Sequence, residues 1–495
     1  MKQPLNDTAP GTLDPRDWDD FRQLAHRMLD EAIDYVMDVR ERPVWQPVLT
    51  EVKARLQGPV PEDGSPLEAV CADFRTDILP YATGNIHPRF LGWVHGSGQP
   101  GNIVADILAS AMNANCGGRD HGAIYVEHEV IDWCKQIFSF PPQASGLLLS
   151  GTSMANMVAL GTARHAADAS IRRHGLSGRS SELVAFASRE AHESVAKALD
   201  ILGLGSASLH TIPVHPDFTI RIDALRSAID EERVAGRQPF CVIGCAATVN
   251  TGAIDDLDQI ASVCAVENLW FHVDGAFGAL GVLSDRLRPR LKGIEKADSL
   301  AFDFHKWMHV QYDSACVLVR NGELHRAAYT MRPPYLESMP RGLAGGASWP
   351  CDFGPELSRS FRALKVWFAF KQHGTRKFGQ LIEQNCAQAR YLESRVSKEP
   401  ELEILAPATL NILCFRYRST DCDERELDLL NEGIVEDLQE RGIAAPSTTR
   451  IEGRLAIRVN ITNHRTSNAD LDLLVDAVLV TARSRLAKTP THQGA

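Results

Sequence analysis

The sequence predicts an α/β fold built on a mostly parallel β-sheet, and three observations carry this prediction. From about residue 100 onward, short apolar runs alternate with longer segments of helical periodicity, which is typical of strand–helix–strand units. The segments of helical periodicity at the N-terminus come before any strand pattern. The polar clusters of the middle of the chain fall at the ends of predicted strands, where sheets of this class bind their ligands.

Residues 1–86 predict an N-terminal helical arm. Between residues 17 and 40, apolar side chains such as Phe21, Leu24 and Met28 recur at helical spacing, and shorter helical patterns follow at 47–56 and 67–78. Because no strand pattern accompanies these helices, we expect them to pack on another surface, such as that of a second subunit.

Residues 87–375 are expected to form one large α/β domain. Its predicted strands lie at 146–149, 183–187, 240–247, 269–273, 299–302 and 315–319, and its predicted helices at 103–113, 126–138, 154–174, 194–202, 257–267 and 361–374. Gly374 is a typical helix stop and marks the end of this domain. Residues 376–495 predict a smaller α+β domain, with helices at 378–398, 424–441 and 468–486 and strands at 411–417 and 456–460.

Composition limits the class of protein. The 495 residues suffice for two or three domains, and 44% hydrophobic with 23% charged residues is typical of a globular chain. A formal net charge of -11 argues against nucleic acid or an anionic membrane as the main partner, and no apolar run is long enough to span a bilayer. The eleven cysteines are scattered without a CxxC pair, and no secretory leader is visible. These features predict a cytoplasmic protein.

One lysine and one aspartate stand out in the large domain. Lys306 lies between aromatic residues, and Asp274 ends the apolar run that begins at Leu269. A lysine that can form a Schiff base, together with an acidic partner for a pyridinium nitrogen, is the pair that pyridoxal phosphate (PLP) chemistry requires. The same two segments would also suit an ordinary buried strand edge, with Lys306 extending to solvent.

Three further polar clusters follow predicted strands. The turn from Ser150 to Ser153 offers backbone N–H groups and hydroxyls that favour an anion, although the hydroxyls could simply cap the helix that follows. His192 could stack on a flat cofactor or cap the next helix. Thr251 lies in a turn and could meet a cofactor or only the turn backbone.

Two other segments bear on the chemistry. His128 and Glu129 lack the second histidine of the helical zinc motif, so no metal site is predicted. The long stretch that begins at Arg332 has little periodicity, which is typical of an active-site lid. Tyr335 within it, with an ordinary pKa of about 10, would be a proton donor if the lid closes.

Together and in this order, these segments resemble the group II PLP-dependent amino-acid decarboxylases, which include aromatic-L-amino-acid, histidine and glutamate decarboxylases. The resemblance runs from about His87 to the C-terminal domain. Its most specific motifs are His-Val-Asp ending at Asp274, His-Lys-Trp ending at Trp307, and residues 360–367, while His-Pro-Arg-Phe ending at Phe90 resembles the entry to the substrate pocket. The resemblance implies a PLP-dependent transferase fold of type I, PLP as cofactor, and a homodimer with the active site at its interface.

The resemblance also implies roles on the cofactor side. Lys306 would form the Schiff base with PLP, Asp274 would pair with the pyridinium nitrogen and keep it protonated, and His192 would stack on the ring face. Two residues of the turn would hold the phosphate, the histidine before the lysine would lie near it, and one threonine would lie near the ring oxygen: Thr152, Ser153, His305 and Thr251.

On the substrate side, Phe90 and Trp93 would line the pocket across a dimer interface. Tyr335 corresponds to the family's lid tyrosine, which is implicated in protonating the α-carbon after carbon dioxide leaves. The sequence departs from the family's commoner pattern at Gly275, at Phe304 and over residues 341–356. Because these departures lie near the substrate side, they leave the choice of amino acid open.

The implied reaction converts an L-amino acid to the corresponding amine and carbon dioxide. One alternative is decarboxylation with oxidative deamination to an aldehyde, an activity that accompanies loss of the lid tyrosine or the stacking histidine in this family. Both Tyr335 and His192 are present, which favours simple decarboxylation. Another PLP reaction on the same fold, such as transamination or desulfuration, and a PLP-binding protein without turnover stay open as further alternatives.

Overall fold

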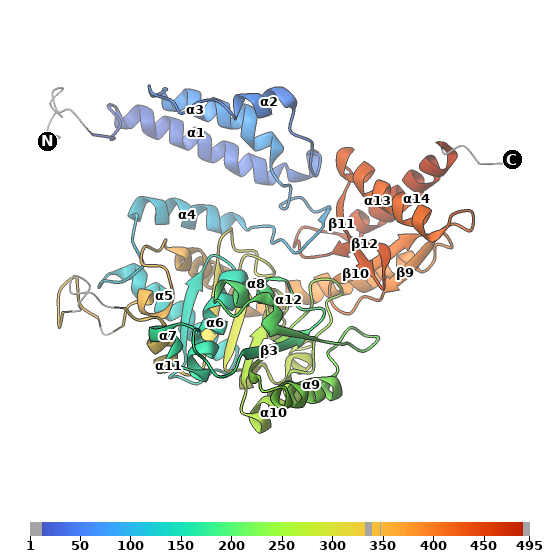
Figure 1. Cartoon of the computed structure of the whole chain (residues 1–495). Helices are drawn as coiled ribbons and strands as arrows, with labels where there is room; N and C mark the ends of the chain where they lie inside the picture. Colours follow the sequence, from blue (N-terminus) through green and yellow to red (C-terminus); the bar gives the residue numbers. More distant parts are fainter. Residues whose placement is uncertain (1–11, 332–338, 347, 489–495) are drawn as a thin grey trace.

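The computed structural model describes residues 12–331, 339–346 and 348–488, which fold around two β-sheets (Figure 1). The larger sheet has seven strands in the order β2-β8-β7-β6-β5-β3-β4. The five strands from β7 to β4 are parallel, whereas β8 and β2 are antiparallel to their neighbours. The predicted α/β class with a mostly parallel sheet is confirmed. The strands are β2 (Ser145–Leu149), β3 (Leu183–Ser188), β4 (Leu209–Ile212), β5 (Gln238–Cys245), β6 (Trp270–Asp274), β7 (Ser299–Asp303) and β8 (Ala315–Val319).

Helices surround this sheet, and several differ from the prediction. The predicted helix at 154–174 is interrupted, because the chain leaves α6 at Asp168, whose backbone is extended, and becomes helical again only in α7 from Ile171. The Asp168 carboxylate accepts a hydrogen bond from the Ser170 backbone N–H, which offers the chain a turn in place of another helical residue. Strand β4 and helices α9 and α11 were not predicted. The helices are α4 (Pro100–Met112), α5 (Gly122–Ile137), α6 (Thr152–Ala167), α7 (Ile171–His174), α8 (Ser194–Ile201), α9 (Ile222–Val234), α10 (Leu257–Glu267) and α11 (Gly322–Tyr329).

The smaller sheet has five strands in the order β1-β11-β12-β10-β9. It includes a segment from much earlier in the chain, because β1 (Phe90–Leu91) pairs parallel to β11 (Ala445–Ile451). Helix α12 (Arg362–Val396) has non-helical backbone angles at Gly374, where we predicted a helix stop. The division into domains at 86 and 375 stays a prediction. The other elements are β9 (Leu402–Ala406), β10 (Ile412–Tyr417), β12 (Arg454–Asn460), α13 (Glu424–Glu440) and α14 (Asn468–Lys488).

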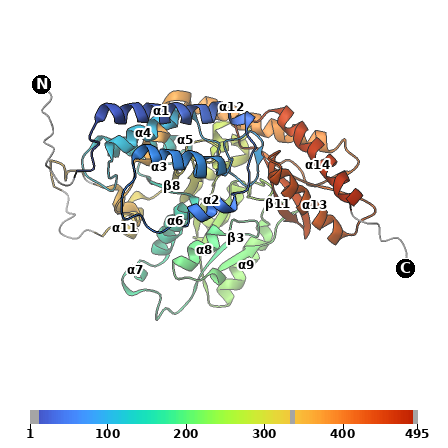
Figure 2. The same ribbon diagram turned by 90° about the horizontal axis from the view of Figure 1, so that it is seen from above.

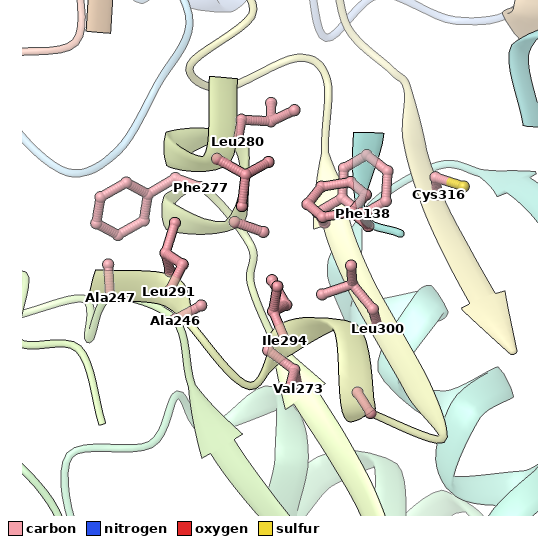
Figure 3. Close-up of a cluster of buried hydrophobic side chains, with 14 of the residues drawn as sticks. Phe138, Ala246, Ala247, Val273, Phe277, Leu280, Leu291, Ile294, Leu300 and Cys316 are labelled. Atoms are coloured by element: carbon pink, nitrogen blue, oxygen red, sulfur yellow. The ribbon is translucent and has the colours of Figure 1, made fainter. Parts of the chain in front are cut away.

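A hydrophobic core packs against the strands that end at the functional site. Leu280, Leu291 and Ile294, which follow β6, pack in one buried cluster with Val273 of β6 and Leu300 of β7 (Figure 3). All five side chains are at most 4% exposed. Burying one such side chain stabilises a fold by about 1.5–3 kcal/mol. This packing fixes the carboxyl end of β6, and with it the position of the residue that follows Val273.

The N-terminal helices form a layer of their own above α4 (Figures 1 and 2). They are α1 (Trp18–Met37), α2 (Thr50–Arg55) and α3 (Leu67–Asp73). Asp17 caps α1 by accepting hydrogen bonds from two backbone N–H groups of the first turn. None of the twenty residues of α1 is buried within the chain. Among the described residues, no helix combines the length and the apolar character that crossing a membrane requires.

Candidate active site

A cavity of about 280 Å³ lies at the carboxyl ends of the parallel strands. This size is close to the lower end of the range for small-molecule sites, about 300 Å³. Four of the predicted site residues line it together: Trp93, His192, Asp274 and Lys306. They come from four separate segments of the chain. The cavity also includes side chains from β11 and β12, so it lies between the two sheets.

Lys306 is held by a buried carboxylate. Its Nζ lies 2.9 Å from Oδ2 of Asp303, the last residue of β7, whose side chain is 2% exposed. Oδ1 of Asp303 accepts a hydrogen bond of 2.7 Å from the Thr152 backbone N–H, and Nε2 of His305 lies 3.6 Å from Oδ2. Asp303 therefore connects the lysine to the predicted phosphate turn. Asp303 was not predicted as a site residue, although a carboxylate at the end of an apolar strand was the signal that identified Asp274.

Asp274 is held from two sides. Its Oδ1 accepts a hydrogen bond of 3.1 Å from the Ala276 backbone N–H, and its Oδ2 accepts one of 3.0 Å from Nδ2 of Asn156. The carboxylate is only 6% exposed, and hydrogen bonds to an ionised acceptor are stronger than neutral ones. The amide donor, Asn156 in α6, carried no recognisable signal in the sequence.

His192 both caps a helix and lines the cavity. Its Nδ1 accepts a hydrogen bond of 3.1 Å from the backbone N–H of Ser194, the first residue of α8, and the ring lines the cavity. A neutral imidazole that accepts at Nδ1 carries its proton at Nε2. His192 is therefore a helix-capping residue and a cavity residue at the same time.

The turn before α6 has the features of an anion site. Oγ1 of Thr152 is buried and has no hydrogen-bond partner within the described ranges, and Ser153 beside it is exposed. A Cβ added at Gly151 would have one neighbour within 4 Å, Cε1 of His305 at 3.8 Å. A free hydroxyl and an open backbone at a helix N-terminus are what a phosphate group requires. Together with Lys306 and the Asp274 carboxylate, these residues fit PLP.

Three other predicted residues lie beside the cavity or beyond the described part of the chain. Thr251 is buried, and its Oγ1 lies 3.2 Å from that of Thr248, a cavity residue. The Phe90 ring lies 6.0 Å from the Trp93 ring, behind the cavity wall. Tyr335 is outside the described residues.

Arg458 is a cavity residue that the sequence analysis did not identify. Its guanidinium is 3% exposed and donates hydrogen bonds to the backbone carbonyls of Val249 and Trp93. Burial lowers the pKa of Arg458 to about 10. Because it lies on β12 and contacts two walls of the cavity, it joins the smaller sheet to the site.

Comparisons with known proteins agree with this site. Residues 50–418 match the model of the pyridoxal-dependent decarboxylase conserved domain. An aromatic-L-amino-acid decarboxylase from Bacillus atrophaeus is 34% identical over 92% of this chain and 93% of its own length. A histidine decarboxylase from Rattus norvegicus is 28% identical over 93% of this chain and 70% of its own. The solved structure of Oryza sativa TDC with PLP and tryptamine has a TM-score of 0.88 at 25% identity, covering 96% of this chain and all of that one.

The family match covers most of the chain, and it includes Trp93, His192, Asp274 and Lys306 of the cavity wall. The fold is that of PLP-dependent enzymes of type I, and the cofactor is PLP. On these grounds the chain belongs to the pyridoxal-dependent decarboxylase family and is a PLP-dependent amino-acid decarboxylase.

Proposed function

We propose that this enzyme converts an aromatic L-amino acid to the corresponding amine and carbon dioxide. The observation that carries the proposal is one cavity that holds Lys306, Asp274 and His192 and also has the aromatic side chains Trp93 and Phe277 in its walls. The relative at 34% identity is an aromatic-L-amino-acid decarboxylase, which supports the same class of substrate.

On the cofactor side, we assign the amine of Lys306 to covalent attachment of PLP and the Asp274 carboxylate to its pyridine nitrogen. When bound, PLP supplies an electron-withdrawing ring for the electron pair of the bond that is broken. We assign the His192 ring to stacking on the face of PLP, because the residue lines the cavity. Around the phosphate we place three residues, with one threonine near the ring oxygen: Thr152, Ser153, His305 and Thr251.

On the substrate side, we assign Trp93 and Phe90 to the aromatic ring of the amino acid. Trp93 is 52% exposed, so an aromatic substrate can cover it, and Phe90 supports it from behind at 6.0 Å. Offset or tilted aromatic pairs at this distance contribute about 0.5–1.5 kcal/mol beyond their buried area. Tyr335 stays our predicted proton donor to the α-carbon.

The proposal is tested with the holoenzyme and a panel of the twenty proteinogenic amino acids, DOPA and 2,4-diaminobutyrate. Products are identified by mass spectrometry, and carbon dioxide and hydrogen peroxide are measured in the same samples. We expect an aromatic amine and carbon dioxide in equal amounts without peroxide. Turnover of only non-aromatic substrates would contradict the proposed substrate class, and stoichiometric peroxide with aldehyde would contradict simple decarboxylation.

We also propose that the enzyme is a cytoplasmic homodimer with the active site at its interface. Exposed apolar side chains lie on α1, which has no buried residue, and on α4 beneath the arm: Phe21 and Ile33, and Val104, Ile107, Leu108 and Met112. An amphipathic helix gains most of its stability from packing of its apolar face. We therefore expect another protein surface to bury the exposed apolar side chains of these helices. A second copy is the occupant we favour, because Trp93 at the cavity is also half exposed. All eleven cysteines are free thiols, which suits a reducing compartment.

Light scattering coupled to size-exclusion chromatography tests the dimer. We expect twice the chain mass of 54.5 kDa for the unmodified protein. The double substitution Ile107→Lys with Leu108→Lys, which places charges on the apolar face of α4, is expected to shift the mass toward that of one chain. Val234→Lys is the matched control, since Val234 is 89% exposed at the end of α9. A single-chain mass for the unmodified protein would contradict the proposal.

A further inference from the structure

A buried chain of polar side chains lies behind Asp274. Trp270 Nε1 donates to Ser299 Oγ at 2.8 Å, and Ser299 Oγ lies 2.9 Å from Nδ1 of His272. On the other side of the ring, Nε2 of His272 lies 3.0 Å from Oδ1 of Asn156, whose Nδ2 donates to Oδ2 of Asp274 at 3.0 Å. This series of hydrogen bonds passes from β6 to β7, back to β6 and on to α6, and it ends at Asp274 in the cavity wall.

The direction of these hydrogen bonds has one solution when Asp274 is ionised. An indole N–H only donates and an ionised carboxylate only accepts, so both ends of the chain are fixed. Ser299 therefore accepts from Trp270 and donates to Nδ1 of His272, which donates from Nε2 to the Asn156 carbonyl. The reverse orientation of the Asn156 amide would place its oxygen against Asp274, which suits only a protonated carboxyl.

Burial keeps this arrangement free of water. Asn156, His272 and Ser299 each have 0% exposure. Burial also lowers the pKa of His272 to about 4, so its imidazole is neutral near pH 7 and has a single N–H to donate. That proton is used by Asn156, which leaves the amide N–H₂ group for Ser194 at 3.2 Å and for Asp274.

We propose that Asn156 and His272 are positioning residues that hold the Asp274 carboxylate oriented toward the pyridine nitrogen of PLP. The inference rests on the role proposed above for Asp274. The two hydrogen bonds from Ala276 and Asn156 use about half of the acceptor sites of the carboxylate, and the remaining sites are available at the cavity. Without the amide donor, the carboxylate would keep only the hydrogen bond from Ala276 and would no longer be held from both sides.

The variants separate this role from a merely structural one. Asn156→Leu and His272→Phe remove the donors, whereas His272→Gln keeps a donor near the position of Nε2 and serves as the conservative rescue. Asn431→Leu is the control, because Asn431 is an equally buried asparagine in α13 whose side chain bonds to Tyr417 and Leu427 and, within the described residues, to no cavity residue. Removing a residue that orients a metal ligand typically costs 10–100-fold in metal affinity or activity. We expect a loss of the same order when a residue that orients Asp274 is removed.

The readout is the ¹⁵N chemical shift of the pyridine nitrogen in holoprotein loaded with ¹⁵N-labelled PLP, together with the dissociation constant of PLP. We expect a protonated nitrogen in the unmodified protein, in His272→Gln and in Asn431→Leu. Asn156→Leu and His272→Phe are expected to shift the signal toward the unprotonated form and to weaken PLP binding roughly 10–100-fold. Ser299→Ala, which removes only one hydroxyl, is the milder variant if the larger changes prevent folding.

Two outcomes distinguish this inference from the role of Asp274 itself. If Asp274→Asn leaves the pyridine nitrogen protonated, the proposed role of Asp274 is wrong. If Asp274→Asn shifts the signal but folded Asn156→Leu, His272→Phe and Ser299→Ala do not, Asp274 acts without the buried chain and the inference is overturned.

Discussion

Lys306→Ala is expected to abolish the visible absorbance of covalently bound PLP and to lower the rate of decarboxylation by at least roughly 10²–10⁴-fold, the effect of removing an acid–base group. Lys306 supplies both the amine that attaches PLP and a group that can move protons in the cavity. Absorbance spectra of the purified protein and amine release under saturating PLP measure the two effects.

Two further variants control this experiment. Lys306→Ala leaves the buried carboxylate of Asp303 without its cation, which destabilises the fold. Lys306→Arg keeps a positive charge beside Asp303 but cannot attach PLP in the same way, so we expect it to fold and to be inactive. Lys371→Ala, on the surface of α12 near Trp133 and Trp367, should retain both absorbance and activity. An active Lys306→Arg enzyme with unchanged absorbance would contradict the assignment.

Asp274→Asn is expected to lower kcat by roughly 10²–10³-fold, the effect of removing one preorganised electrostatic partner from an active site. The amide has almost the same shape as the carboxylate but carries no charge to hold a protonated nitrogen. Steady-state kinetics at saturating PLP, with the dissociation constant of PLP measured separately, distinguish a loss of chemistry from a loss of binding.

Asp255→Asn is the matched control for this substitution. Asp255 is also buried and also accepts two backbone hydrogen bonds, from Ile220 and Cys245, but its side chain does not line the cavity. We expect Asp255→Asn to change stability without a comparable loss of kcat. Equal losses in both variants would mean that the charge of Asp274 has no special role.

Much of the site could be predicted from the sequence because its polar residues lie at the ends of predicted strands. Asp274, His192 and Lys306 each lie at the end of an apolar run or after one, and parallel strands bring such positions to one edge of the sheet, so these three residues meet in one cavity. Thr152 was predicted in the same way, from its place between a strand and a helix, and its buried hydroxyl is free within the described residues.

Long-range partners could not be predicted in this way. Arg359 and Glu127, both with side chains 1% exposed, form an ion pair across 232 positions of sequence, and neither residue has a local pattern that names the other. Asn156 looks like any polar residue of a helix, although it supports Asp274. Strand β4 has four residues, of which only Ile212 is buried, so the hydrophobic pattern that reveals a strand was too weak.

The most direct test of the central claim is to locate the covalent site of PLP in the holoenzyme. The purified protein is reduced with borohydride, digested, and mapped by tandem mass spectrometry for a phosphopyridoxyl group on lysine. The structure predicts that this group is found on Lys306, with no comparable modification at any other lysine. A phosphopyridoxyl group on a different lysine, or none in protein that has bound PLP, would contradict the account.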